Sequence, residues 1–388
     1  MPFPLKRVAV IGAGPSGLSA APIPEKLPSV NPSEPEDPST RTGLYNSLDS
    51  NVGALAMAFT YAPFPVENTA HSVTRYGRDN PTRPWQTVAR RASWRRDQDY
   101  WWQERFDAVI AASGHYTLAN IPPIEGLAET ARELPHKFEH SKAFRSKVIV
   151  VGGSVSASDL VDDLHSIVQG PLILSQRGFN EILEKVWNLP NVIRKPQIKR
   201  VSPFGGGLIE FADGSITRDF DKVIFATGYK LSYAFLPGNP VTEQNRLDGF
   251  YQHIFKIGDP TLAVVGQIKA AISFRVYEYQ AIAVARFFAG RSRPLPGIHE
   301  QHDWEGKRLE YKGPTNKFHE IKPDLAEYFN WLRDFAGPPA EGTEAYELPK
   351  WQDEWGVLGF KILELKDKYW ESIGGTGRVL GEIVKAKL

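Results

Sequence analysis

Cysteine is absent from this chain of 388 residues. Its absence excludes disulfide frameworks, cysteine-ligated metal sites, thiol nucleophiles and redox-active cysteine pairs. Long apolar runs are missing as well, since no stretch approaches the roughly 20 apolar residues that a membrane-spanning helix needs. The first residues run directly into an apolar strand and lack the charged-then-apolar pattern of a targeting peptide. We therefore expect a cytoplasmic protein without a membrane span.

The chain also lacks an excess of charge of either sign. The 46 Lys and Arg residues stand against 45 Asp and Glu residues, which gives a formal net charge of +1. This balance argues against a nucleic acid or an anionic membrane surface as the main partner. The length allows a large core that is divided between two or three domains.

A glycine turn is present close to the start of the chain. Gly12, Gly14 and Gly17 follow the apolar run Val8–Ile11 in the spacing G-x-G-x-x-G. In a dinucleotide-binding fold the first glycine makes a tight turn, the second lets the backbone approach a pyrophosphate, and the third lets the helix pack on the strand. The positive end of the helix dipole then faces the phosphates. We interpret this stretch as a nucleotide-binding strand, turn and helix.

The second strand of such a fold does not follow. Six prolines fall between Pro22 and Pro38, and the acidic residues Glu34, Glu36 and Asp37 stand among them rather than at the end of a strand. We predict that the turn still forms, that the segment from Pro22 to Pro38 is an irregular loop, and that the nucleotide binds poorly. The missing strand leaves a sheet position unfilled and apolar surface uncovered.

Two short signals occur twice, in alternation. An apolar strand that ends in glycines occurs at Arg7–Gly17 and again at Lys147–Ala157, and the pattern F-D-x-V-I-x-A-[ST]-G occurs at Phe106–Tyr116 and Phe220–Tyr229. Continuous apolar runs of this length are typical of buried parallel strands. The expected strands are Val8–Ile11, Val109–Ala112, Val148–Val151 and Val223–Ala226. The alternation predicts an α/β fold of two Rossmann-like units in three layers, with mostly parallel sheets and the smaller unit inserted in the larger. The expected boundaries are 1–140 for the first part of the larger unit, 141–221 for the inserted unit, and 222–388 for the rest with a helical tail.

The second glycine turn is degenerate. Gly152 is in place, whereas Ser154 and Ala157 occupy the positions of the second and third glycines. The run after it predicts a strand at Leu172–Leu174 that ends in Ser175 and Arg177 instead of an acid. An arginine at this place accommodates a 2′-phosphate and favours NADP over NAD. An ordinary strand–helix turn and a surface arginine are the alternative interpretations.

Further elements follow from local patterns. The stretch "SVSASDLVDDLHSIV" has helical spacing, and "LIEFADGSITRDF" reads as a hairpin that turns at Asp213–Gly214. The stretch "FRVYEYQAIAVARFFAGR" predicts a helix that Gly290 closes. From about Trp304 onward the chain is rich in aromatic and charged residues, and we expect helices that pack over the core.

Five stretches together resemble the flavin-containing monooxygenase family in its fungal form. They are "VAVIGAGPSGLSAA", "LYNSLDSNVGALAMAFTYAPFP", "FDAVIAASGHY", "HSKAFRSKVIVVGGSVSASDL" and "FDKVIFATGY". The segment "PTLAVVGQIKAAISFRVYEYQAIAVARF" and the tail are also similar, so the resemblance covers most of the chain from Leu44 onward. Its most specific part is Leu48-x-Ser50-Asn51 followed by "APFP", which matches a loop whose asparagine lies beside the flavin and the nicotinamide.

The resemblance implies an NADPH-dependent flavoprotein monooxygenase with FAD and NADP(H) as cofactors. In that family the reduced flavin takes up O2 as a C4a-hydroperoxide, and a nitrogen or sulfur atom of a small-molecule substrate attacks the distal oxygen. Asn51 is the implied catalytic residue, because its carboxamide can donate and accept a hydrogen bond at once. No metal and no nucleic acid are expected, and a homodimer is allowed. The implied cofactor-binding residues are Gly12, Gly14, Ser16, Gly17, Ser50, Asn51, Ser113, Gly114, Gly152, Ser154, Ser156, Ala157, Asp159, Ser175, Arg177, Thr227, Gly228 and Gln280.

The chain departs from the family pattern in three places. Of the signature that joins the two units only His140 is present, the stretch "VARRASWRRDQDYWWQE" is too short for the expected helix and strands, and the second strand with its ribose-binding glutamate is absent after Ala21. These gaps look like excised segments. They leave two alternatives open: a catalytically impaired remnant that binds nucleotide weakly, and a Baeyer–Villiger or N-hydroxylating relative. The missing cysteines exclude disulfide reductases of similar architecture.

Overall fold

The structure is a computed structural model, and it describes seven parts of the chain. These are residues 7–12, 106–116, 118–138, 147–178, 181–270, 272–342 and 346–357. The loop from Pro22 to Pro38, the shortened stretch before Phe106, and His140 lie outside them.

The chain divides into two compact units. The first unit comprises Met1–Leu118 and Lys230–Ile362, and the second comprises Ala119–Tyr229 and Leu363–Leu388. The inserted unit therefore begins before the expected boundary at 141 and continues past the one at 221. The reason is strand pairing, since the strand that starts at Lys222 joins the sheet of the second unit.

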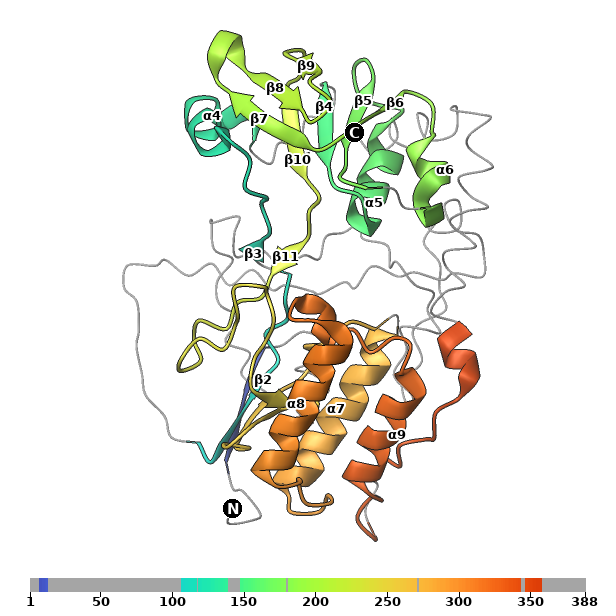
Figure 1. The fold of residues 1–388 in the computed structure, drawn as a ribbon. Helices are drawn as coiled ribbons and strands as arrows, with labels where there is room; N and C mark the ends of the chain where they lie inside the picture. Colours follow the sequence, from blue (N-terminus) through green and yellow to red (C-terminus); the bar gives the residue numbers. More distant parts are fainter. Residues whose placement is uncertain are drawn as a thin grey trace, which may run out of the picture. The chain divides into compact units, whose positions relative to one another are not determined.

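The first unit is built on a five-stranded sheet with helices packed on it (Figure 1). Its strands run in the order β1-β2-β14-β13-β12. The first three are parallel, and the last two continue the sheet in antiparallel fashion. The elements are β1 (Val8–Ile11), β2 (Ala108–Ala111), β12 (Phe250–Tyr251), β13 (Phe255–Lys256), β14 (Leu262–Val264), α7 (Ser273–Phe288), α8 (Ile298–Lys312), the short 3-10 helix η5 (Asn316–His319) and α9 (Leu325–Ala336).

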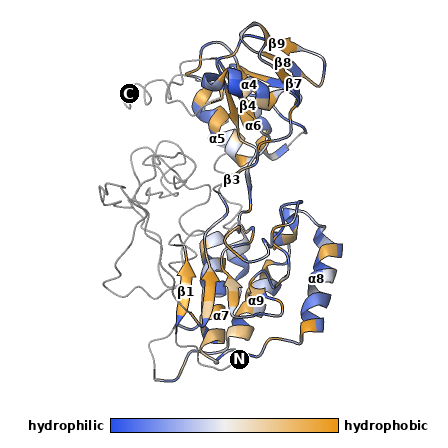
Figure 2. Ribbon diagram, turned by 90° about the vertical axis from the view of Figure 1, so that its left-hand side faces the viewer, coloured by the Kyte–Doolittle hydropathy of each residue, from blue (hydrophilic) through white to orange (hydrophobic). Residues whose placement is uncertain are grey.

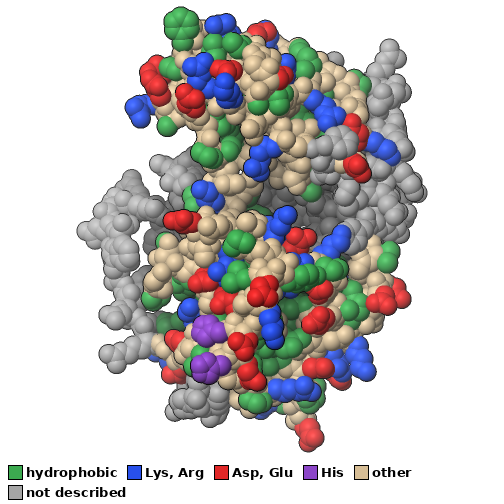
Figure 3. Space-filling model, in the orientation of Figure 1, with side chains coloured by type: hydrophobic (Ala, Val, Ile, Leu, Met, Phe, Trp, Pro, Cys, Tyr) green, Lys and Arg blue, Asp and Glu red, His purple; other side chains and the backbone are tan. Residues whose placement is uncertain are grey.

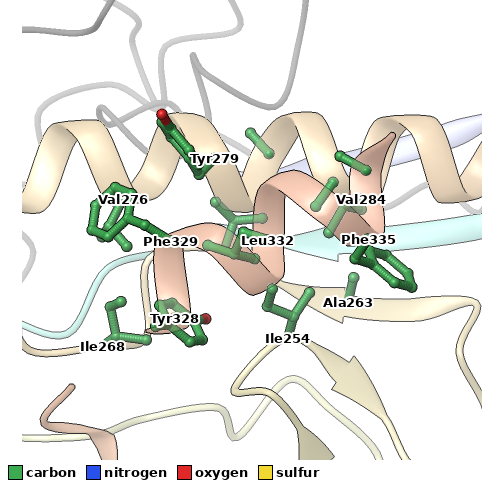
Figure 4. Close-up of a cluster of buried hydrophobic side chains, with 14 of the residues drawn as sticks. Ile254, Ala263, Ile268, Val276, Tyr279, Val284, Tyr328, Phe329, Leu332 and Phe335 are labelled. Carbon is green, nitrogen blue, oxygen red and sulfur yellow. The ribbon is translucent and has the colours of Figure 1, made fainter. Parts of the chain in front are cut away.

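The core of the first unit lies between α7, α9 and the sheet. Figure 4 shows Tyr328, Phe329 and Leu332 of α9 directed into the space between α7 and the strands. Tyr279 of α7 meets the ring of Phe329 with ring centroids 4.8 Å apart. The expectation that the aromatic tail packs over the core is therefore confirmed for α9.

The second unit contains an all-parallel sheet and a small antiparallel one. The parallel strands run in the order β10-β4-β5-β6, and β7-β8-β9 form the antiparallel sheet. The elements are α4 (Leu127–Glu133), η2 (Pro135–Lys137), β4 (Val148–Val151), α5 (Val155–Leu164), β5 (Leu172–Ser175), η3 (Glu181–Leu183), α6 (Glu184–Trp187), β6 (Val192–Lys195), β7 (Ile198–Ser202), η4 (Phe204–Gly206), β8 (Leu208–Phe211), β9 (Ile216–Thr217) and β10 (Lys222–Phe225). The two-residue strands β3 (Leu118–Ala119) and β11 (Tyr229–Lys230) pair where the chain passes from one unit to the other.

The locally encoded elements agree with the sequence. Strands β1 and β4 have the expected bounds, the bounds of the other expected strands differ by one residue, and the expected hairpin turns at Gly214, whose φ is 80°. Helix α7 ends at Phe288, and Gly290 follows with a φ of 70°. Glycine suits both positions because positive φ is costly for other residues. The α/β class with two dinucleotide-type units is confirmed.

Strands β1 and β4 differ in how well they are covered. All four residues of β4 are buried, and the strand pairs with β10 on one side and β5 on the other. Strand β1 pairs with β2, and no other described strand lies along its second edge. Its Val8 and Ile11 are 36% and 39% exposed, although Figure 2 colours the strand as hydrophobic throughout. Within the described residues, β1 is therefore an apolar strand with one unpaired edge.

Candidate nucleotide-binding sites

Each unit contains a glycine at a position where a neighbouring carbonyl oxygen leaves no room for a side chain. Gly12 follows β1 with a φ of 117°, and a Cβ atom there would lie 2.3 Å from the carbonyl oxygen of Ala112. Gly152 follows β4 with a φ of 154°, and its Cβ would lie 2.4 Å from the carbonyl oxygen of Ala226. Any side chain at either place would collide with main chain that cannot move aside. The two glycines therefore form the same junction, in which the first turn residue presses against the end of a parallel neighbour.

The geometry that the two units share extends to the start of the same strands. Arg7 donates its backbone N–H to Asp107 Oδ2 at 2.8 Å, and Lys147 donates its backbone N–H to Asp221 Oδ2 at 2.9 Å. In both units the Asp of the F-D pattern thus fixes the beginning of the glycine-turn strand. The registers are equivalent too, since Val8 pairs with Ala108 and Val148 with Lys222. The repeated sequence signals are therefore a repeated pair of parallel strands.

The second unit carries a complete strand–turn–helix. The N–H of Gly152 donates to the carbonyl oxygen of Ser175 at 2.9 Å, which joins the turn to the end of β5. Ser154 is the extended N-cap of α5, and its side chain makes no capping hydrogen bond. Ala157 is fully buried between helix and sheet, as close helix packing requires of the third turn position. Ser156 and Asp159 lie in the first turns of α5. The free N–H groups at the start of such a helix suit a phosphate.

Ser175 and Arg177, at the end of β5, have different surroundings. Ser175 is fully buried, and its hydroxyl donates to the carbonyl oxygen of Pro196 at 2.8 Å, so it serves the protein and is not free for a ligand. Arg177 is exposed and makes no hydrogen bond or ion pair within the described part of the chain. A free guanidinium at this edge fits a 2′-phosphate.

The Ser-Gly pair after β2 and the Thr-Gly pair after β10 also differ in their contacts. Thr227 donates its hydroxyl to the carbonyl oxygen of Asn120 at 2.6 Å, and the Asn120 amide donates to the carbonyl oxygen of Thr227 at 3.2 Å. The N–H of Asn120 donates to the carbonyl oxygen of Gly228 at 2.8 Å. Thr227 and Gly228 thus hold the entering segment of the second unit. In the first unit, Ser113 and Gly114 are exposed at the corresponding place.

Gln280 lies inside α7 and is fully buried. Its Oε1 accepts from the N–H of Gly266 at 2.9 Å, and its Nε2 donates to the Tyr328 hydroxyl at 2.8 Å. That hydroxyl donates in turn to the carbonyl oxygen of Gln252 at 2.9 Å. The amide of Gln280 therefore positions the turn after β14, at the edge where β1 and β2 also end.

A group of buried histidines in the first unit carries no recognisable sequence signal. Leu247 donates its N–H to His319 Nε2 at 3.0 Å, and the Nδ1 atoms of His319 and His253 are 3.1 Å apart. His319 therefore holds its proton on Nδ1 and donates it to His253, which leaves both rings neutral. Burial, followed by the charge of Arg246, lowers the pKa of His319 to about 3. Burial, followed by Lys269, lowers the pKa of His115 to about 4.

The remaining expected site residues fall outside the described ranges. They are Gly14, Ser16, Gly17, Ser50 and Asn51. Among the residues that the structure describes, no group of three or more side chains could hold a metal ion. No helix in those same ranges is long and apolar enough to cross a membrane. On the face in Figure 3, positive and negative side chains are interspersed rather than gathered by sign.

Comparison with known proteins agrees with this geometry. The family model described as flavin-binding monooxygenase-like matches residues 187–337. The flavin-containing monooxygenase FMO GS-OX-like 2 of Arabidopsis thaliana is 27% identical, and the match covers 93% of this chain and 90% of the relative. The thiol-specific monooxygenase of Saccharomyces cerevisiae is 25% identical over 79% of this chain and 83% of the relative. The alignment with the plant protein spans 443 positions, more than the 388 residues of this chain, so the relative has segments without a counterpart here.

Solved structures show the same fold. The S-allyl-L-cysteine S-oxygenase from Allium sativum has a TM-score of 0.59 at 21% identity, and the match covers 94% of this chain and all (100%) of the other. Tmm from Pelagibacter sp. strain HTCC7211 has a TM-score of 0.64 at 18% identity, with 92% and 90% of the two chains covered. The duplicated glycine junctions, the family model and the relatives agree with one another: the chain is similar to flavin-binding monooxygenase-like proteins.

Proposed function

We propose that this chain uses FAD and NADPH to transfer one oxygen atom from O2 to a nitrogen or sulfur atom of a small molecule. The duplicated junction carries the proposal, because such an enzyme must hold two dinucleotides and the chain has two equivalent places for them. The name of the yeast relative, a thiol-specific monooxygenase, favours sulfur as the acceptor.

The residues of each unit fit one of the two cofactors. In the first unit, Gly12 lets the main chain turn against β2, and a ligand phosphate could approach a turn that has no side chain at this point. In the second unit, Gly152, Ser154 and Arg177 would hold NADP(H) by its pyrophosphate and 2′-phosphate. FAD, when bound, would accept electrons from NADPH and deliver them to O2. The proposed part of Asn51 is to bridge flavin and nicotinamide with its carboxamide.

One observation favours a second candidate function, a family member with impaired FAD binding. The outer edge of β1 is uncovered within the described residues, and Val8 and Ile11 on it are partly exposed. A dinucleotide fold places its second strand and its ribose-binding acid at this edge. Loss of a hydrogen bond to a charged group costs about 1.5–3 kcal/mol of binding free energy. The dissociation constant for FAD would therefore rise by about tenfold or more, even before the missing strand is considered.

Purified protein separates the two candidates. The flavin spectrum gives the FAD content as isolated, and NADPH oxidation with added FAD is then followed together with oxygen uptake. A dialkyl sulfide, a tertiary amine and a cyclic ketone serve as substrates, with mass spectrometry of the products. We expect sulfoxide formation that depends on both NADPH and added FAD. Absence of any oxygenated product at saturating FAD would contradict the proposed activity and leave the impaired protein.

An arginine variant tests the assignment of the second unit. Arg177→Ala should raise the KM for NADPH and leave the KM for NADH nearly unchanged, because the exposed guanidinium would face the 2′-phosphate alone. An equal loss with both nucleotides would instead indicate a folding defect.

A further inference from the structure

Two polar side chains of the first unit come from the carboxyl edge of its parallel strands. His115 follows β2, and Lys269 lies in the loop between β14 and α7. The two strands pair in parallel, with Val264 opposite Ala111, so both loops leave the sheet at the same edge. Gly12 follows β1 at that edge as well. The α/β folds bind their ligands outside the carboxyl ends of such strands.

Backbone hydrogen bonds fix the position of Lys269. Its N–H donates to the carbonyl oxygen of His319 at 2.8 Å, and its own carbonyl oxygen accepts from the N–H of Ile321 at 3.3 Å. Residue 269 thereby pairs with Glu320 in a short parallel bridge. The loop after β14 is thus tied to the chain that follows η5, and the side chain of Lys269 starts from a defined place.

The side chain of Lys269 is a cation without a bound counterion. It is exposed, and its ammonium group makes no hydrogen bond or ion pair within the described residues. Partial burial of that group lowers its pKa, the charge of Glu320 raises it, and the charge of Lys317 lowers it further. A cation that has lost part of its water and has no paired acid is stabilised by an anionic ligand.

His115 adds a second polar group close to this cation. Burial, followed by the charge of Lys269, lowers the pKa of His115, so the imidazole is neutral at physiological pH. Its Nδ1 is buried and has no hydrogen-bond partner among the described residues. Native proteins rarely retain such an atom unless a ligand or a water completes it. An ammonium group and an imidazole N–H both donate, so a ligand group with two acceptor oxygens suits the pair.

We propose that Lys269, beside the neutral ring of His115, binds a carboxylate group of the substrate and selects anionic sulfides and amines over neutral ones. This inference rests on the proposed oxygenation of sulfur or nitrogen. A carboxylate does not itself accept the oxygen atom, so it holds the molecule while the sulfur or nitrogen atom stays free to react. Phosphate offers similar acceptor oxygens, and the experiment distinguishes the two anions.

Chemical labelling of the full-length chain tests the binding without turnover. The rate at which acetic anhydride modifies Lys269 is followed by peptide mass spectrometry, with FAD added. The probes are (methylsulfanyl)acetate and its amide, which has nearly the same shape and no charge, each titrated to a plateau. The carboxylate should slow the modification of Lys269 by about threefold to tenfold and leave that of Lys307, an exposed residue of α8, unchanged. Equal protection by the amide or by inorganic phosphate would overturn the proposal.

Variants separate the charge of Lys269 from a folding defect. Lys269→Gln should lower kcat/KM for sulfoxidation of the carboxylate by about threefold to tenfold relative to that of the amide, and Lys269→Arg should restore most of the difference. Lys307→Gln is the matched control and should leave the ratio unchanged.

Two results with Lys269→Gln would contradict the proposal. One is an equal loss of kcat/KM for the carboxylate and the amide. The other is a dissociation constant for FAD that rises as much as the KM for the carboxylate, because Lys269 would then serve the cofactor. Protection of Lys269 by the carboxylate without any oxygenated product would reject the monooxygenase function alone.

Discussion

The two strands that precede the glycine turns, β1 and β4, make the same contacts at both ends but are buried to different extents. At the start of each strand a backbone N–H donates a hydrogen bond to an aspartate. After each strand comes a glycine, because a neighbouring carbonyl oxygen leaves no room for a Cβ atom. Strand β4 lies between two parallel neighbours and is buried along its length. Strand β1 has one described neighbour, and Val8 and Ile11 remain partly exposed. The glycine junction is thus the same in both units, whereas a second parallel neighbour beside the strand before the glycine is described only in the second unit.

The largest expected effect is the loss of stability of the first unit at acidic pH. The pKa values of His115, His253 and His319 are lowered from 6.5, chiefly by burial and further by Arg246, Lys269 and Arg308. Below pH 6.5 the unfolded chain takes up protons that the folded chain does not, so stability falls as pH falls toward 4. Each group contributes about 1.4 kcal/mol per pH unit over that window, so the three together contribute about 4 kcal/mol per pH unit. Hydrogen exchange followed by mass spectrometry at pH 7 and 5.5 resolves the two units.

A histidine variant and its control sharpen this prediction. His319→Gln can still accept from the N–H of Leu247 but cannot gain a proton, so the pH dependence should become shallower. His302→Gln, at a side chain that is 59% exposed, should leave the pH dependence of the first unit unchanged. Equal slopes in both variants would show that the buried pair does not govern acid stability.

Paired glycine substitutions test whether the two junctions are equivalent. Gly152→Ala should destabilise the second unit by about 2–4 kcal/mol, since the new methyl group meets the carbonyl oxygen of Ala226 and a positive φ is imposed on alanine. Gly12→Ala should cost a similar amount in the first unit because it meets Ala112 in the same way. Denaturation monitored by unit-resolved hydrogen exchange gives both values. Gly306→Ala, in an exposed helical position with nothing within 4 Å, should be neutral or slightly stabilising. A harmless Gly12→Ala would break the equivalence of the junctions.

Much of this architecture follows from the sequence because the signals are local. A run of four apolar residues, a glycine that needs positive φ, and a helix with one apolar face are each decided within a few residues. The unit boundaries are not local, since Lys222–Phe225 could join either sheet and its pairing with β4 decides the matter. The roles of Ser175 and Gln280 were equally hidden, because their partners Pro196 and Gly266 are distant in sequence or on another element.

Two features of the candidate site escape sequence reasoning altogether. Gln176 lies between the end of β5 and Arg177, and its burial against Gly153 is visible only in the fold. His253 lies between β12 and β13 and His319 is the last residue of η5, so the two meet only in the fold.

Equivalent valines measure the difference in cover between the two strands. Val148 of β4 is 2% exposed and Val8 of β1 is 36% exposed, and they hold the same position in the repeated motif. Val148→Ala should cost about 2 kcal/mol, while Val8→Ala should cost less than about 1 kcal/mol, because little apolar surface is removed from a partly exposed site. Chemical denaturation of each variant provides the test. Equal costs would mean that β1 is as well covered as β4.

The two aspartates that fix the strand starts should give the smallest effect. Asp221→Ala and Asp107→Ala each remove an exposed hydrogen bond to a backbone N–H, and the loss of that bond should cost about 1 kcal/mol. The two values are expected to agree within experimental error. A cost confined to Asp221→Ala would indicate that the first unit does not rely on the same contact.

The binding of FAD tests most directly the proposal that FAD binding is impaired in the first unit, where no described strand lies along the outer edge of β1. The FAD content of the purified chain and its FAD dissociation constant are measured before and after a relative's second-strand segment is inserted at Ala21. The account predicts substoichiometric FAD in the unmodified chain and binding at least about tenfold tighter after the insertion, with NADP⁺ affinity unchanged. Stoichiometric and tight FAD in the unmodified chain would contradict it, and would mean that another segment covers the free edge of β1.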